Sequence, residues 1–306
     1  MTGGRIAAAA ALLTCAAACF LAPPARAQEL EPRLLANVPV HTNFVVAGYA
    51  FTRGNILLDP AVPIEGLDGN LHTFLGAYVR SIYFFGLSGK VDAVVPFASG
   101  DWTGLLEGQD TARSVAGFGD PRIRLSVGLA GSPALEKSEF AGWKQKTVVG
   151  AALQLVMPFG QYEASRLINL SSNRWTFRPQ VGVSHAMGPW ILESNAAVWL
   201  FTDNPDFFGG QRLEQRPLFA FKVHGIRTLS RGWWFSLGAG YGVGGRSLLD
   251  GVERDLHIST FRFGGVVAAP LGRGHSVKLV LNSGARIERG PDFDGIALTY
   301  QYVWGG

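Results

Sequence analysis

Outside its N-terminal segment, the chain lacks cysteine. Both Cys15 and Cys19 fall within the first 27 residues. The remainder therefore has neither a disulfide framework nor a cysteine-based metal site. The six histidines show no pair at the spacing of a metal site either. We expect no bound metal ion and no cofactor.

Charged residues are also scarce, at 16% of the sequence, and the formal net charge is +4. Removal of residues 1–27 takes away Arg5 and Arg26 and no acidic residue, which lowers the net charge to +2. Strong attraction to a polyanion requires a larger excess of positive charge. We therefore expect no nucleic-acid partner.

After residue 27, long apolar runs are absent. None approaches the roughly 18 residues of a membrane-spanning helix, so a membrane protein with this sequence has to be a β-barrel. The single long apolar run follows Arg5 and leads to "PPARA" at residues 23–27. This pattern predicts a cleaved secretory signal peptide at 1–27, followed by one unit at 28–306. Acylation of either cysteine is the alternative, but the residues before each one fit a lipobox poorly.

Glycine and aromatic residues are abundant, with 40 glycines and 11% aromatics. This composition suits many short strands joined by turns. About twelve segments show a side-chain period of two, as in a β-strand. Two of them are apolar on both faces, at 42–53 and 71–84, so their facing is not determined. The others lie at 90–97, 122–129, 147–159, 174–183, 190–201, 218–226, 233–243, 259–268, 276–284 and 295–304.

The connections between these segments alternate in length. Tight joints such as "MGPW" and "SRGW" alternate with long acidic segments, and one joint, 130–142, is longer than the pattern predicts. The long segments are 54–70, 99–119, 160–173, 202–216, 245–256 and 286–294. Short turns at one rim and long loops at the other are typical of bacterial outer-membrane barrels. We predict an all-β fold, an antiparallel transmembrane β-barrel of about twelve strands in the cell outer membrane with both termini in the periplasm.

Polar and charged residues gather on one face of the predicted strands. A charge at the lipid midplane is unfavourable by about 2 to 4 kcal/mol, so these side chains are expected to line the interior. The inward candidates are Lys90, Asp92, Arg122, Arg124, Arg174, Arg178, Glu193, Lys222, Arg262 and Lys278. Basic side chains outnumber acidic ones in this set.

These inward charges have two interpretations. In the first, they pair with carboxylates and backbone in a structural network. In the second, they form a basic constriction that selects anions and favours aromatic carboxylates over neutral phenols. The selectivity residues would then be Arg122, Arg124, Arg174 and Arg178, which we expect in pairs on adjacent segments, with bidentate carboxylate geometry.

Four glycines follow the inward face of another predicted strand. They are Gly238, Gly240, Gly242 and Gly244. Without side chains the wall is thin there. This bare stripe is the expected place for an open lumen, although the same glycines would also let the barrel bend or give neighbouring side chains room.

The last predicted strand carries an apolar-to-aromatic stripe on one face, from Ile296 to Trp304. We expect this face to meet lipid, with its aromatics at the membrane boundary. A terminal strand of this kind also fits recognition by the barrel-assembly machinery. The expected interfacial girdle consists of Trp175, Trp190, Trp199, Trp233 and Trp304.

Four stretches carry a resemblance to a known family. They are "GFGDPRIRLSVGL" at 117–129, "VMPFGQY" at 156–162, "INLSSNRWTFRPQVGVSHAMG" at 168–188 and "VWLFTDNPDFFGG" at 198–210. They resemble the outer-membrane proteins of the MetA-pathway of phenol degradation family, and the likeness extends over nearly all of 28–306. The resemblance implies a channel or transporter for passive uptake of small, often aromatic, compounds. It brings no catalytic signature.

We therefore expect a channel and not an enzyme, with two alternatives. A lipid hydrolase would use His257 and Ser259, which share one strand face at the spacing of an outer-membrane phospholipase. The asparagine and glycine expected after that serine are replaced by Thr260 and Phe261. The other alternative is a barrel filled by its own side chains.

The expected partners are outer-membrane lipid and lipopolysaccharide, a small-molecule substrate and the assembly machinery. Acidic loop tips would hold divalent cations between lipopolysaccharide molecules, although plain solvated loops are the simpler explanation. These tips contain Asp203, Asp206, Asp292 and Asp294.

Overall fold

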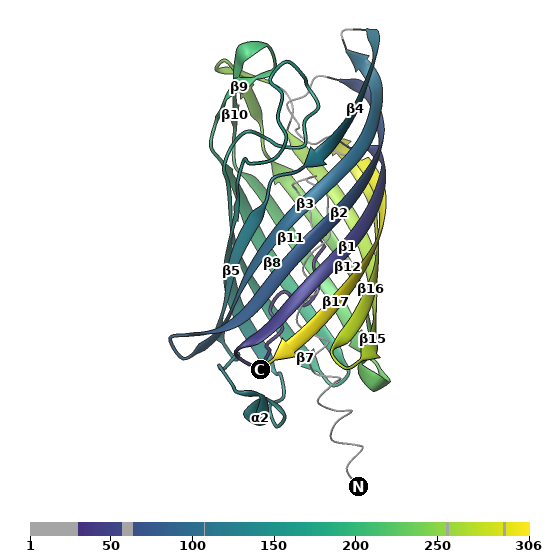
Figure 1. The fold of residues 1–306 in the computed structure, drawn as a ribbon. Coiled ribbons are helices and arrows are strands. Elements are labelled where there is room, and N and C mark those ends of the chain that lie inside the picture. The colour runs from purple at the N-terminus through teal and green to yellow at the C-terminus, as the bar shows by residue number, and fades with distance from the viewer. Residues whose placement is uncertain (1–29, 57–63, 107, 255–256, 290–291) are drawn as a thin grey trace.

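The computed structural model describes residues 30–56, 64–106, 108–254, 257–289 and 292–306. The chain forms a closed barrel of twelve antiparallel strands (Figure 1). The predicted all-β class and strand number are confirmed. The predicted signal peptide lies outside the described residues. No helix in the described part of the chain is long and apolar enough to cross a membrane.

Each predicted segment corresponds to one barrel strand. The strands of the large sheet are β1 (Thr42–Asn55), β2 (Glu65–Phe84), β3 (Leu87–Leu106), β4 (Gln109–Phe118), β5 (Arg122–Ala130), β6 (Thr147–Val156), β7 (Thr176–Met187), β8 (Trp190–Phe201), β11 (Leu218–Thr228), β12 (Trp234–Gly244), β15 (Ile258–Gly272), β16 (His275–Arg289) and β17 (Asp292–Gly305). A small second sheet consists of β9 (Asn204–Phe207), β10 (Gln211–Gln215), β13 (Ser247–Leu249) and β14 (Val252–Glu253). The helical turns are α2 (Lys137–Phe140), η1 (Phe208–Gly210) and η2 (Ser230–Gly232).

One position in the wall is shared by two short strands. The upper part of β3 pairs with β4, and its lower part pairs with β5. Between them lie Gly119, Asp120 and Pro121, and proline has no N–H to give to a ladder. The break leaves the Asp120 carboxylate available to the loops above it.

The predicted long loop at 99–119 is wrong. β3 continues to Leu106 and β4 returns from Gln109, so most of this segment is a hairpin that extends the wall upward (Figure 1). Small and polar residues interrupt the apolar alternation there, which hides the strand in the sequence. Pairing of β3 with the start of β2, such as Asp101 with Asn70, keeps it extended.

Side chains alternate between the two surfaces of the wall. On β7, Val181 is 58% exposed on the outer face, whereas Gln180 is 4% exposed on the inner face. On β17, Leu298 and Tyr300 are exposed and Thr299 is buried. The outward direction predicted for the closing stripe is therefore confirmed, and β17 closes the barrel by pairing with β1 along its whole length.

The two ends of the barrel differ as predicted. Tight turns follow β2, β7, β11 and β15 at the end that carries the C-terminus, which is the periplasmic end of such a barrel (Figure 1). The long joint at 130–142 also lies there and contains α2. At the opposite, extracellular end, the loops carry the second sheet.

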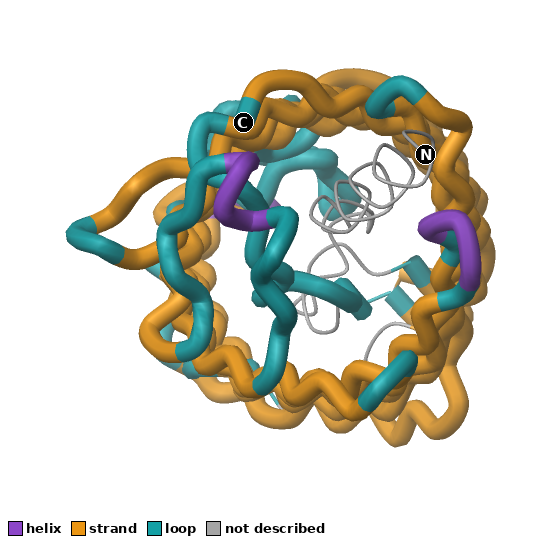
Figure 2. Tube along the Cα trace, turned by 90° about the horizontal axis from the view of Figure 1, so that it is seen from below, coloured by secondary structure: helices purple, strands orange, loops and turns teal. Residues whose placement is uncertain are grey.

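Residues 30–41, which we call the lumen segment, run inside the barrel. Leu34, Leu35 and Val38 pack against inward residues of β1 and β2, including Phe44 and Val79. Seen from below, loop segments cross the ring of strands (Figure 2). This explains why the sequences of β1 and β2 are apolar on both faces: the inner face packs against the lumen segment, and the outer face is the exposed surface of the barrel.

The predicted tryptophan girdle needs one correction. Trp175, Trp190, Trp233 and Trp304 are between 37% and 44% exposed on the outer surface. Trp199 is only 3% exposed and lies inside the barrel. Trp199 shares the parity of the inward residues Glu193 and Asn195 on β8, so the period of two places it inside, and only its residue type suggested the girdle.

Candidate functional site in the barrel lumen

The register of the strands places the inward charged residues in rows. Asp92 on β3 pairs with Arg124 on β5. Gln154 on β6 pairs with Arg124 on one side and Arg178 of β7 on the other. Strands lie about 4.8 Å apart, so the Cα atoms of the two arginines are about 10 Å apart. The expectation that the arginine pairs lie on adjacent segments is wrong, because β6 separates them.

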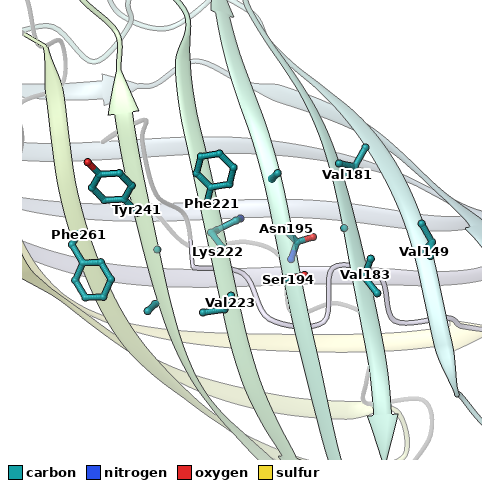
Figure 3. A pocket seen from close by; sticks show the side chains of 14 residues that line it. Val149, Val181, Val183, Ser194, Asn195, Phe221, Lys222, Val223, Tyr241 and Phe261 are labelled. Atoms are coloured by element: carbon teal, nitrogen blue, oxygen red, sulfur yellow. The ribbon is translucent and has the colours of Figure 1, made fainter.

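A second row crosses β8, β11, β12 and β15. Lys222 lies between Asn195 and Gly240, and Gly240 separates Lys222 from Arg262. Lys222 is 2% exposed and Asn195 is 5% exposed, whereas Phe221 is 51% exposed on the outer surface (Figure 3). The row therefore presents two cations to the lumen with a glycine between them.

The outer surface of these strands is hollowed by a groove of about 510 Å³ (Figure 3). Exposed side chains such as Val181, Val183 and Phe221 line it, and the small residues Ser194 and Ala239 also contribute. These side chains alternate along the strands with the inward row, so the groove lies on the outer surface of the barrel.

Arg124 is the centre of a buried ion-pair cluster that joins the wall to the lumen segment. Its Nη1 donates to Glu31 Oε2 at 2.7 Å, and its Nε donates to Asp92 Oδ2 at 3.0 Å. The three side chains are at most 5% exposed. Here Arg124 is part of a structural network, because carboxylates match its charge.

Lys90 and Glu193 hold the lumen segment at two further points. Lys90 Nζ donates to the carbonyl oxygens of Leu34 and Ala36 at 2.9 and 3.0 Å. The Glu193 carboxylate accepts the backbone N–H of Arg33 at 2.6 Å. These contacts lie on β3 and β8 respectively.

The side chain of Arg33 reaches a third part of the wall. Its Nη2 donates to Thr228 Oγ1 at 3.0 Å, and its guanidinium lies 4.7 Å from the centroid of the Trp234 ring. Trp234 belongs to β12, which is distant from β3 in strand order. The lumen segment therefore crosses the interior between separate parts of the wall.

Other inward cations lie against amides, backbone carbonyls and aromatic rings. Arg174 Nη2 donates to Gln215 Oε1 at 2.5 Å, and Arg178 lies 4.5 Å from the centroid of the Trp199 ring. Arg262 lies 3.7 Å from the centroid of the Phe293 ring. Such contacts hold a guanidinium in place.

The last two predicted cations differ in burial. Lys278 Nζ lies 3.5 Å from Gln301 Oε1 and is buried. Arg122, which starts β5, is only half-buried. The inward direction predicted from parity therefore agrees with the burial of the set, and Arg122 is its most accessible member.

The glycine stripe of β12 is not bare. A Cβ at Gly238 would lie 2.2 Å from His224 Nδ1, and one at Gly240 would lie 3.2 Å from Leu30 Cδ2. Gly242 shares the inward face, and Gly244 ends the strand with a φ of +111°. The expectation of an open lumen along this stripe is thus corrected: the glycines make room for a neighbouring ring and for the lumen segment.

The proposed hydrolase pair lies at the extracellular end of β15. Ser259 shares the parity of Phe261 and Phe263, which are 40% and 50% exposed on the outer surface. Its Oγ lies 3.3 Å from the hydroxyl of Tyr241, and His257 precedes the strand. A neutral tyrosine hydroxyl is a poor general base for a serine.

The stretches that carry the family resemblance meet at Asp120. Its Oδ1 accepts the N–H of Gly160 at 3.2 Å, and its Oδ2 accepts the N–H and the hydroxyl of Ser172 at 3.0 and 3.1 Å. Gln161 N donates to Phe118 O at 2.7 Å. These residues therefore shape the extracellular loop at 160–173, which is a structural role.

Replacing Asp120 with Ala is expected to loosen this loop by at least about 2 kcal/mol, because one hydrogen bond to a charged acceptor contributes about 1.5 to 3 kcal/mol and the Asp120 carboxylate accepts three. Trypsin should then cleave after the exposed Arg166 much faster than in the unchanged protein. Asp110→Ala is the matched control, because Asp110 lies on an exposed part of the β3–β4 hairpin. Equal cleavage rates for the two variants would contradict the role of Asp120.

A family model described as "Putative MetA-pathway of phenol degradation" matches residues 60–299. The chain belongs to this family. The match spans most of the barrel, and the resemblance predicted from the sequence is confirmed. No curated protein matches the chain.

Three solved structures are similar to this MetA-pathway family protein to different degrees. An outer-membrane channel from Pseudomonas putida F1 is 19% identical, with 90% of this chain and 100% of that chain covered and a TM-score of 0.74. The β domain of the Bordetella autotransporter BrkA is 14% identical, with 86% and 100% covered and a TM-score of 0.49. The toluene transporter TbuX of Ralstonia pickettii is 10% identical, with 94% and 100% covered and a TM-score of 0.45. The first match establishes an outer-membrane barrel fold for the MetA-pathway protein.

Sequence reasoning missed the lumen segment and its residues Glu31, Arg33 and Leu34. The stretch "EPRLLANVPV" at 31–40 shows no period of two, so it gives no strand signal. The stretch begins with charged residues and continues with apolar ones. Because these apolar residues are not part of a predicted strand, they had to pack against another part of the protein, and this was the available sign of the lumen segment.

Proposed function

We propose that the protein is an outer-membrane channel for passive uptake of small compounds, with a preference for anions and, among them, aromatic ones. The observation that supports it is a closed barrel whose inward charges are mostly basic. Rings of arginine and lysine favour anions in a pore. The phenol-degradation pathway named in the family description supports aromatic cargo.

The direct test is single-channel recording from residues 28–306 refolded into planar bilayers, with different salt concentrations on the two sides. We expect discrete, anion-selective openings that benzoate blocks. A correctly folded barrel that stays silent would contradict the proposal.

The row of Lys222 and Arg262 provides a sharper prediction. Replacing both with Met should lower the anion-to-cation permeability ratio several-fold, because two buried cations leave the inner surface. Reversal potentials in a salt gradient measure this ratio. Arg231→Met, on the exposed periplasmic turn η2, is the control. If the variant with both Lys222 and Arg262 replaced has the same reversal potential as the unchanged protein, other residues determine the selectivity.

A filled barrel is the second candidate, favoured by the contacts of the lumen segment with several strands. Such a barrel would give neither openings nor block by benzoate. The hydrolase is the weaker alternative, since Thr260 and Phe261 replace the asparagine and glycine that follow the serine in an outer-membrane phospholipase. We therefore propose no catalytic role for His257 and Ser259.

The proposed route to the outer membrane uses the leader at 1–27 and the assembly machinery, which would recognise the aromatic stripe of β17. Lipid would surround the apolar outer face, and lipopolysaccharide would surround the loops. Of the acidic loop residues, Asp203 already pairs with Arg212. Cation bridging to lipopolysaccharide is therefore proposed for the remaining tips only.

A further inference from the structure

A separate pocket of about 240 Å³ lies among the extracellular loops. Its apolar lining includes Leu67, Trp102, Leu167, Ile168 and Phe208. An apolar cavity of about 150 Å³ is enough to bind benzene. The loop pocket, as we call it, therefore has room for one aromatic ring with a small substituent.

The walls of the loop pocket are fixed in place. Trp102 is 1% exposed, and its Nε1 donates to Ile56 O at 3.1 Å. Asn169 closes the loop beside it by accepting the N–H of Glu163 at 2.8 Å and donating to the carbonyl oxygens of Glu163 and Arg166. A preformed pocket loses little conformational entropy when it binds a ligand.

Two arginines and one carboxylate provide the charge of the pocket. Arg113 and Arg166 both line it. Arg113 Nη2 lies 3.0 Å from Glu163 Oε2, and Arg166 Nε lies 3.5 Å from Glu163 Oε1. A hydrogen bond from Ser165 lowers the pKa of the Glu163 carboxyl most, desolvation opposes it, and the nearby guanidinium of Arg113 lowers it further. The carboxylate is therefore ionised at neutral pH, and this group of three carries one net positive charge.

Arg113 also has a donor to spare. Its Nε is buried, and no residue in the described part of the chain accepts a hydrogen bond from it. A buried N–H without an acceptor is unfavourable, so a ligand oxygen at this point would be favoured. The fork of a guanidinium suits a carboxylate, which binds two N–H groups at once.

We propose that the loop pocket binds a small aromatic carboxylate of the benzoate class, with its ring against Trp102 and Phe208 and its carboxylate toward Arg113 and Arg166. The apolar lining accepts the ring, and one added negative charge neutralises the pocket. A neutral phenol matches the lining but not the charge. This proposal rests on the proposed uptake function, in which the loop pocket would be a capture site at the extracellular end. Binding of the carboxylate to the pocket can be measured without measuring conduction.

The test is a ¹⁹F NMR titration of the full mature chain in detergent micelles with 4-fluorobenzoate, and with 4-fluorophenol as the neutral probe. We expect saturable binding of 4-fluorobenzoate only. Arg113→Gln should weaken it at least about tenfold, the loss expected for a hydrogen bond to a charged group. Arg166→Gln, on a more exposed side chain, is the second variant in case the first one folds poorly.

Two further variants separate recognition from general charge. Glu163→Gln removes the carboxylate that competes for both arginines, so it should strengthen binding of 4-fluorobenzoate. Arg212→Gln removes the same charge from an exposed extracellular site outside the pocket, and it should leave binding unchanged. A folded barrel gives a heat-dependent shift in electrophoretic mobility, which checks each variant.

Three results would overturn the site: equal affinity for both probes, equal affinity in the unchanged protein and both pocket arginine variants, or equal weakening in Arg212→Gln. Failure of the channel gives a different result. Saturable binding of 4-fluorobenzoate to a barrel that never conducts would contradict the uptake proposal and support the loop pocket as a binding site. Conduction without saturable binding would do the reverse.

Discussion

Replacing Arg124 with Met should destabilise the barrel by about 3 to 5 kcal/mol, the usual loss when one partner of a buried ion pair is removed. The guanidinium lies between Glu31 and Asp92, and all three side chains are almost fully buried. Its removal takes away a counter-ion that both carboxylates share. Denaturant unfolding of the refolded protein in micelles measures the change.

A matched control for this variant is Arg212→Met. Arg212 also pairs with a carboxylate, Asp203, but the two side chains are 59% and 38% exposed. Exposed pairs contribute no more than about 1 kcal/mol. A loss of the same size in both variants would mean that burial of the Arg124 cluster is unimportant.

A rescue variant tests the cause of the loss. Converting Glu31 and Asp92 to Gln and Asn in the Arg124→Met background removes the two carboxylates that Arg124 pairs with. Stability should then recover in part, because neutral groups are less unfavourable than charges in a buried site. Failure to recover would indicate that Arg124 acts through packing and not through charge.

The barrel was predictable because lipid outside and polar groups inside impose strict alternation on a strand. The same rule explains its failures. On β1 and β2 the inner face is apolar, since Leu34 and Leu35 cover it, so alternation is lost. At Trp199 the ring packs under Arg178 inside the barrel, a pairing that residue type alone does not reveal.

The partners of the inward charges could not be predicted, although their direction could. Period two shows that Arg124 points inward, but its partner Glu31 is 93 residues away in the chain. That contact requires both closure of the barrel and entry of the lumen segment. The loop pocket was missed for a similar reason, because Arg113 fell within a predicted loop and only the β3–β4 hairpin brings it to Glu163.

Deleting residues 28–38 should increase the single-channel conductance several-fold, because it removes most of the lumen segment from the interior, while Pro39 still accepts its hydrogen bond from Ser81. The deletion also loses buried Leu34, Leu35 and Val38, which contribute at most about 1.5 to 3 kcal/mol each. The truncated barrel will therefore be less stable, and its folding must be checked by its heat-dependent mobility before recording.

A synthetic peptide of residues 30–41 serves as the control for the deletion. Added to the periplasmic side, it should reduce the raised conductance, whereas a peptide of the same composition in scrambled order should not. The specificity follows from the contacts that only the native order can make, such as Lys90 with two backbone carbonyls and Glu193 with the N–H of Arg33. If the folded, truncated barrel conducts no more than the full chain, the lumen segment is not the constriction, and the rows of inward arginine and lysine must themselves limit the flow.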